Sequence, residues 1–186
     1  MDHYADGVEV PPCSTAQLRK LASQIRSAIG LADDKAFPVG RFIEYVLPEV
    51  YEDFTLEIVP IGQLGEKHGE TFPNKHLMRL REDVYIGICM GNGQHRFTGA
   101  HECSHLIYHE GVPLAMARRS AKRLPRFRNS EWQADTLAAE LLMPYKAVKR
   151  MDTRDIERQY GVSPSAALCR REKIDKEMMQ YRYLKI

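Results

Sequence analysis

The chain has 186 residues, of which 44% are hydrophobic and 28% charged, and its formal net charge is only +2. These values are ordinary for one soluble globular domain, and so small a net charge is no argument for a nucleic acid partner. No apolar run approaches the roughly 18 residues that span a bilayer, and the acidic start lacks the apolar core of a signal peptide. The four cysteines show no disulfide or metal-binding spacing, which favours a reducing, cytoplasmic location.

The first half of the chain predicts helices followed by strands. Residues 1–13 resemble a tail that ends in two prolines, and residue 14 begins a single domain that runs to residue 186. Apolar residues at helical spacing predict a helix over 15–29, which Gly30 ends, and a second over 38–46. Alternating residues over 54–59 predict a strand, with a second strand expected over 75–80. The pattern over 81–89 fits either a continued strand or a helix.

The second half predicts mostly helices. A turn at Gly91 and Gly93 precedes a helix over about 98–109. Shorter helices are expected over 130–142, 145–150, 152–159 and 163–171, so the C-terminal part, from about residue 151, is helical. The expected fold class is therefore α+β, a mostly helical domain with a small sheet.

His101, Glu102 and His105 form an HExxH motif in the expected 98–109 helix. Histidines four residues apart share a helix face, with Cβ atoms roughly 5–6 Å apart. Both imidazoles can then bind one zinc ion, at about 2.0–2.1 Å per bond. Glu102 is placed to act on a water held by the metal rather than to bind the metal.

A catalytic zinc site commonly needs a third protein ligand, and four residues downstream are candidates: His109, Glu131, Asp135 and Glu140. His109 lies about 12 Å along the helix axis from His101, at roughly 1.5 Å per residue, which is too far for one ion. We instead expect His109 to be a structural cation at the C-terminal helix dipole. Glu131 is the best choice, because Ser130 and Gln133 suggest a capping box that places Glu131 in a first helical turn.

Asp135 follows Glu131 by about one turn. Its carboxylate could hold a ligand imidazole through the other ring N–H, or Asp135 could simply be an exposed helix residue. Cys103, inside the motif, is expected to be a small buried hydrophobe rather than a reactive group.

Two stretches resemble a known family, the ImmA/IrrE-type metallopeptidases of bacteria and their mobile elements: RFTGAHECSHLIYH over 96–109 and EWQADTLAAELLMP over 131–144. The family pattern reads RFTxAHExxHxxxH, then ExxAN or ExxAD before FAAxLLMP. This chain departs from the usual residues at Gly99, at Cys103 and Ser104, and at Leu137. None of these four is a candidate ligand, so the differences concern packing rather than chemistry.

The resemblance implies a zincin-like metallopeptidase domain that binds one zinc ion per chain. His101, His105 and Glu131 would be the ligands, and Glu102 would be the catalytic carboxylate. It also implies a protein substrate, namely a helix-turn-helix repressor or an antitoxin-like regulator of a phage, mobile element or stress response. Candidates for contacting the substrate or the oxyanion, chosen by chain order alone, are His95, Arg96 and Tyr145.

Two features leave a second reading open, a metal-bound regulator that binds DNA or a protein partner without cleaving it. Residues 155–171 could form a helix-turn-helix in which Arg170 and Arg171 contact DNA, although a helical lid packed on the core is the favoured reading. Six basic residues between 118 and 128 could form a rim that attracts acidic segments or phosphates, or simply a solvated loop.

Overall fold

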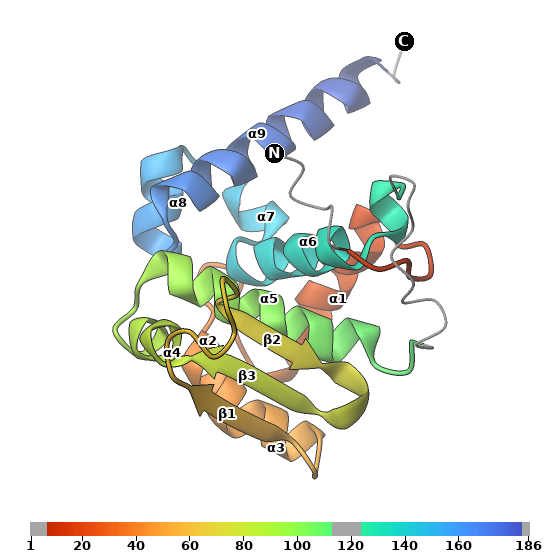
Figure 1. The fold of residues 1–186 in the computed structure, drawn as a ribbon. Helices are drawn as coiled ribbons and strands as arrows, with labels where there is room; N and C mark the ends of the chain where they lie inside the picture. The colour runs from red at the N-terminus through yellow and green to blue at the C-terminus, as the bar shows by residue number, and fades with distance from the viewer. Residues whose placement is uncertain (1–6, 113–123, 184–186) are drawn as a thin grey trace.

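In the computed structural model, residues 7–112 and 124–183 are described (Figure 1). A three-stranded sheet lies against one side of the central helix α5 (Gly93–His109), and α6 (Ser130–Leu142) packs against α5 as well. In Figure 1, α6 lies on the far side of α5 from the sheet, and α9 crosses beyond α6. The predicted α+β class, mostly helical with a small sheet, is confirmed.

The N-terminal helices agree with the sequence pattern. Helix α1 (Thr15–Ala28) begins with a capping box, in which Ser14 and Gln17 bond each other's backbone N–H groups. The predicted second helix is present as three consecutive segments, α2 (Val39–Arg41), a π-helical turn over Phe42–Val46, and α3 (Leu47–Val50). The helical region thus continues four residues beyond the predicted end at residue 46.

The sheet has the strand order β1-β3-β2. Strand β1 (Thr55–Val59) pairs in parallel with β3 (Leu77–Arg81), and β2 (Gly69–Phe72) pairs antiparallel with β3. The predicted strands over 54–59 and 75–80 correspond to β1 and β3, but Pro73–Lys75 form a 3-10 turn, because Pro73 favours a turn start. Strand β2, at the edge of the sheet, was not predicted.

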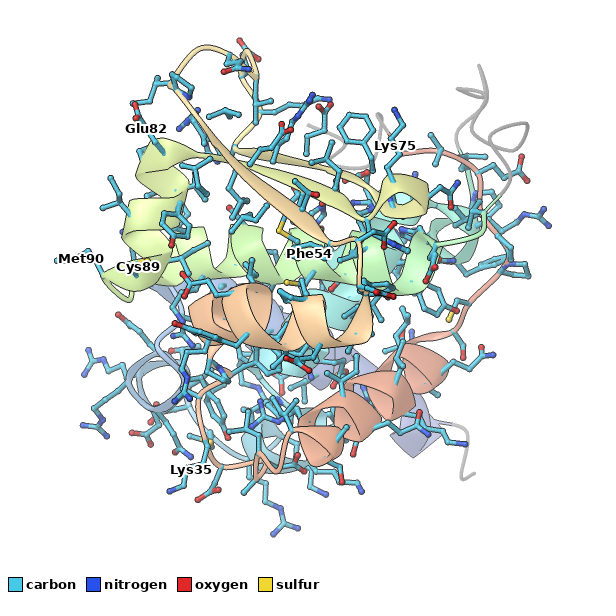
Figure 2. The ribbon with its side chains drawn as sticks, turned by 90° about the horizontal axis from the view of Figure 1, so that it is seen from below. Lys35, Phe54, Lys75, Glu82, Cys89 and Met90 are labelled. Carbon is cyan, nitrogen blue, oxygen red and sulfur yellow. The ribbon has the colours of Figure 1, made fainter. Side chains whose placement is uncertain are left out.

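The undecided segment over 81–89 is a helix, α4 (Glu82–Cys89). Figure 2 shows Cys89 and Met90 at its outer end, where both side chains are exposed. Helix α4 packs on α5, and Gly99 permits the close approach. A Cβ atom at Gly99 would lie 2.8 Å from side-chain carbons of both Ile88 and Val39. The family's usual bulky residue would not fit at this position, so the departure at Gly99 reflects the packing of α5 against its neighbours.

Helix α5 begins at Gly93, five residues before the predicted start, because Asn92 caps it by accepting from the N–H groups of Gln94 and His95. The cap of α6 also differs from prediction. Asn129, not Ser130, is the N-cap residue, and its side chain accepts from the N–H of Trp132. The predicted capping box of Ser130 and Gln133 is therefore wrong, and both side chains bond elsewhere.

An N-terminal segment, residues 8–13, runs beside residues 127–130. The N–H of Val10 donates to the carbonyl of Arg128 at 2.9 Å, and the N–H of Cys13 to that of Phe127 at 2.8 Å. The Val8 N–H donates to the Ser130 hydroxyl at 3.0 Å, and the Ser130 N–H donates to the Val8 carbonyl. Because Val10 and Cys13 are buried, residues 8–13 belong to the domain body rather than to the expected tail.

The C-terminal part is helical, as expected, with α7 (Tyr145–Val148), α8 (Thr153–Tyr160) and α9 (Pro164–Tyr183). Helix α9 continues twelve residues past the predicted end at residue 171. Within residues 7–112 and 124–183, none of the helices combines the length and the apolarity that a membrane span requires.

The two arginines that the DNA-binding reading needs are engaged inside the protein. Arg170 is buried, and its Nε donates to the Met143 carbonyl at 3.0 Å. Arg171 donates to the carbonyls of Val148, Lys149 and Met151. Residues 155–171 are therefore held on the core by the side chains that would have faced DNA.

Candidate metal centre

A cavity of about 640 Å³ opens where β2, α5 and α6 meet. Three elements supply its walls, namely the edge strand with the residues before it, the middle of the HExxH helix, and the first turns of α6. Its lining residues are Glu66, Lys67, His68, Gly69, Glu70, Thr71, Phe72, Phe97, Thr98, His101, Glu102, His105, Glu131 and Asp135.

His101 joins α5 to α6 through both ring nitrogens. Its Nδ1 lies 2.9 Å from Asp135 Oδ1, and its Nε2 lies 3.2 Å from Glu131 Oε2. Burial lowers the pKa of His101, but the hydrogen bonds to Asp135 and then Glu131 outweigh burial and raise that pKa to about 10. Because a carboxylate only accepts, Asp135 fixes a hydrogen on Nδ1, so that Nε2, on the cavity side, is the atom that could bind a metal.

His105 presents its Nε2 to the same point. This atom lies 3.0 Å from His101 Nε2 and 3.4 Å from Glu131 Oε1. The other nitrogen, Nδ1, lies 3.0 Å from Nδ1 of His109. Burial raises the pKa of Glu131, but its hydrogen bonds to His101 and His105 outweigh burial and hold that pKa well below its usual range.

The donor groups of His101, His105 and Glu131 lie close enough together to hold one metal ion. Two ligand atoms about 2.0–2.1 Å from one ion, at the tetrahedral angle, lie about 3.3 Å apart. The two Nε2 atoms lie 3.0 Å apart, and Glu131 faces them with both oxygens, Oε2 at 3.2 Å from His101 and Oε1 at 3.4 Å from His105. One ligand atom from each of the three residues lies within 4.8 Å of the other two. Two imidazole nitrogens and a carboxylate oxygen are also a donor set that suits zinc. The residues present therefore fit a zinc ion.

Glu102 lies beside this cluster without joining it. Its side chain is only 6% exposed, and its Oε2 accepts a hydrogen bond of 2.6 Å from the Thr71 hydroxyl. Gly69 gives the carboxylate room, because a Cβ atom there would lie 2.9 Å from Glu102 Cγ. Sequence reasoning missed Thr71 and Gly69 because both are on β2, and the pattern GETF carries no strand alternation.

His109 does not have the predicted role of a helix-end cation. It is 6% exposed, and burial together with repulsion from His105 lowers its pKa to about 4, so the ring is neutral at neutral pH. Its Nε2 lies 3.1 Å from Gln133 Oε1 on α6. Chain spacing removes His109 from the expected ligand set, and His109 is not part of the group of three that could hold a metal. Spacing does not reveal its contacts with His105 and Gln133.

The structure does not bring His95, Arg96 or Tyr145 to the cavity. The His95 ring fills the space that a side chain on Gly87 would need. Arg96 is buried, and its guanidinium donates to the carbonyls of Phe37, Tyr160 and Gly161. Arg19 stacks 3.8 Å above the Tyr145 ring in a different pocket. Chain order placed these three residues near the motif, but helix geometry points them away.

Two other expectations concern residues near the motif. Cys103 is fully buried, and burial raises the pKa of its thiol, which fits the expected packing role.

Most of the basic run over 118–128 falls outside the described residues. Of its described arginines, Arg128 forms an ion pair of 2.9 Å with Glu9 in the N-terminal segment.

Comparison with known proteins gives a family match and a fold match. The model of the M78 peptidase family, described as the IrrE N-terminal-like domain, matches residues 59–172, which include every cavity-lining residue. A solved structure titled as a Mycobacterium tuberculosis transcriptional regulator superposes with a TM-score of 0.56, at 15% identity. That match covers 83% of this chain but 46% of the regulator, so it shows the fold alone. A search of curated proteins found no similar sequence.

Proposed function

Because the chain belongs to the M78 peptidase family with the IrrE N-terminal-like domain, we propose that it is a zinc-dependent endopeptidase with one zinc ion per chain. The observation that carries this proposal is the convergence of His101, His105 and Glu131, with contacts of 3.0–3.4 Å between their nitrogen and oxygen atoms, beside the Glu102 carboxylate, which is not part of that group. A purely structural zinc site commonly has four protein ligands. Three ligands, together with a carboxylate in the same open cavity that does not bind the metal, are instead typical of a catalytic site.

Zinc, when bound, would lower the pKa of a coordinated water toward about 7 and polarise a substrate carbonyl. His101, His105 and Glu131 would hold the ion, and Asp135 would orient His101 through its Nδ1–H. Glu102 would take the proton of the attacking water and deliver it to the leaving amine. Thr71 would keep the Glu102 carboxylate in place for both transfers by donating to Oε2.

The cavity wall suits an extended peptide. Among the described strands, β2 pairs with β3 alone, so it is an edge strand. Four consecutive residues of β2, Gly69–Phe72, line the cavity. Edge strands bind peptides by adding another strand. A substrate segment paired along β2 would then pass over Glu102 and the three ligands, as an endopeptidase requires.

We further propose that the substrate is a helix-turn-helix repressor or an antitoxin-like regulator of a phage, mobile element or stress response. This proposal depends on the resemblance of the two motifs to ImmA/IrrE-type peptidases. The similar fold of a Mycobacterium tuberculosis transcriptional regulator is compatible with it. Such a substrate would have to expose an extended segment, because folded helices cannot pair along β2.

The first experiment measures zinc by mass spectrometry in the wild type, Glu131→Ala and the matched control Glu172→Ala. Glu172 is an exposed helix residue that does not line the cavity. We expect about one zinc per chain in the wild type and the control, and a sharp loss in Glu131→Ala. A wild type that holds no zinc after zinc addition and dialysis would overturn the proposal.

A second experiment separates cleavage from metal binding. Glu102→Gln keeps the three ligands, so it should bind zinc as the wild type does but fail to cleave a candidate repressor. Cleavage is followed by mass spectrometry of the fragments. Cleavage by Glu102→Gln at the wild-type rate would refute the role of Glu102 as the general base.

The alternative is a metal-bound regulator that binds DNA or a protein partner without cleaving it. The observation favouring it is the fold shared with a transcriptional regulator. The internal bonds of Arg170 and Arg171 argue against DNA contacts by residues 155–171. Repression or derepression that is unaffected by Glu102→Gln in cells would favour this alternative.

A further inference from the structure

The second ligand histidine is held differently from the first. His101 bonds a carboxylate, whereas His105 bonds the ring of His109. A metal-binding histidine needs a hydrogen on one ring nitrogen and a lone pair on the other. A carboxylate enforces this arrangement by itself. A neutral imidazole enforces it only if its own hydrogen is kept on the far nitrogen.

Gln133 supplies that constraint. Its Nε2 donates to two backbone carbonyls, those of Pro11 and Phe127, each at 2.9 Å. Carbonyl oxygens only accept, so both amide hydrogens are committed to them, and the amide cannot rotate by 180° without losing both bonds. Gln133 Oε1 therefore faces His109 Nε2, at 3.1 Å.

The proton positions then follow one after another. Gln133 Oε1 can only accept, so His109 carries its hydrogen on Nε2 and has its lone pair on Nδ1. His109 Nδ1 accepts from His105 Nδ1, at 3.0 Å, so the hydrogen of His105 is on Nδ1. The His105 lone pair is consequently on Nε2, the atom that lies 3.0 Å from His101 Nε2 and 3.4 Å from Glu131.

We propose that His109 and Gln133 are positioning residues, which fix the tautomer of His105 through a directional hydrogen-bond relay that starts at the carbonyls of Pro11 and Phe127. The inference rests on the proposed function, because it assumes that His105 binds zinc. It gives the N-terminal segment a role, since the Pro11 carbonyl helps to decide which atom of Gln133 faces His109. The relay keeps a hydrogen on Nδ1 of His105, as Asp135 keeps one on Nδ1 of His101.

The test in the wild-type protein is nuclear magnetic resonance of the histidine rings, using two-bond hydrogen–nitrogen correlations with zinc bound. We expect His105 to carry its hydrogen on Nδ1 and His109 to carry its hydrogen on Nε2. A hydrogen on Nδ1 of His109 would reverse the relay and overturn the inference. This measurement uses the wild type alone, so its result does not depend on whether any variant folds.

Zinc affinity, measured by competition with a chromophoric chelator, tests the effect of the relay. His109→Phe keeps a ring but removes the acceptor, and we expect it to bind zinc about 10- to 100-fold more weakly. His109→Gln can present an oxygen to His105 Nδ1 and should stay within about threefold of the wild type, so it separates the acceptor from simple packing. Equal affinities of the wild type and His109→Phe would overturn the inference.

Gln133→Glu is the conservative variant on α6 that keeps an acceptor for His109. Both carboxylate oxygens accept, so His109 Nε2–H keeps its partner. The carbonyls of Pro11 and Phe127 lose the bonds from Gln133, although Phe127 keeps the bond from the Cys13 N–H. We expect nearly normal zinc affinity with a less stable fold. Zinc bound by the wild type together with a reversed His109 tautomer would refute the relay alone. A wild type that binds no zinc would refute the proposed function.

Discussion

Replacing Glu140 with Gln tests how α6, which carries Glu131 and Asp135, is fixed in place. Glu140 is 1% exposed, and its Oε1 accepts from Arg19 Nε at 3.0 Å. Its Oε2 accepts from the Tyr145 N–H at 3.2 Å and lies 2.7 Å from Nη2 of the buried Arg170. Both oxygens therefore face donors. In either orientation, the amide of Gln would direct an NH₂ group at one of them.

The expected loss of stability is large because an arginine stays buried without its anion. Breaking a buried ion pair by removing one partner costs about 3–5 kcal/mol. For a chain of this size, each kcal/mol corresponds to roughly 2–4 °C in melting temperature, so Tm should fall by roughly 6–20 °C. The free energy of unfolding is measured by denaturant titration. Equal m-values in the wild type and Glu140→Gln would confirm that both proteins expose the same surface on unfolding, so that their free energies can be compared.

The matched control is Glu177→Gln. Glu177 pairs with Arg19 at 2.9 Å, but both side chains are partly exposed, at 26% and 22%. An ion pair in that setting contributes about 0–1 kcal/mol. A loss below about 1 kcal/mol in Glu140→Gln, or equal losses in the two variants, would refute the reasoning that burial makes the Glu140 contacts decisive.

Two further predictions concern the sheet side of the cavity. Thr71→Val removes the bond to Glu102, so kcat/KM on a cleaved substrate should fall by roughly 10- to 150-fold, since such a charged bond contributes about 1.5–3 kcal/mol. Thr71→Ser should retain activity, and equal rates in both variants would contradict the role of the hydroxyl. His76 bonds Asp53 and Glu110, and chiefly the bond to Asp53 raises its pKa above the usual 6.5. Its charge therefore stabilises the fold fully below about pH 6.5, and this contribution is lost as pH rises through the raised pKa. Unfolding midpoints measured from pH 5 to 9 should show that loss in the wild type but not in His76→Gln. Parallel plots of midpoint against pH for the two proteins would exclude a stabilising contribution from the His76 charge.

The sequence by itself determined the features that depend on short chain distances. The four-residue spacing of His101 and His105 places both rings on one helix face wherever that helix lies. The apolar periodicity of α1 and the alternation in β1 are likewise local, and both elements are present as predicted. Glu131 was chosen among the downstream acids from a suggested capping box of Ser130 and Gln133, which the structure does not contain, and the family resemblance supported the same residue.

Tertiary structure decided the features that depend on pairing between distant segments. Strand β2 has four residues and no alternation, so it exists because β3 offers it a partner, and it supplies Thr71 beside Glu102. Residues 8–13 are ordered by backbone bonds to residues more than 100 positions away.

His109 has one property that the local sequence determined and others that only the tertiary structure decided. The helical rise sufficed to exclude it as a ligand, whereas its neutral state and its contact with Gln133 follow from burial against α6. A hydrogen-bond partner on another helix leaves no trace in local periodicity, because the pattern reports only which face is apolar. Local spacing therefore determined which atoms could bind the metal, and the packing of α5, α6 and β2 decided which side chains orient them.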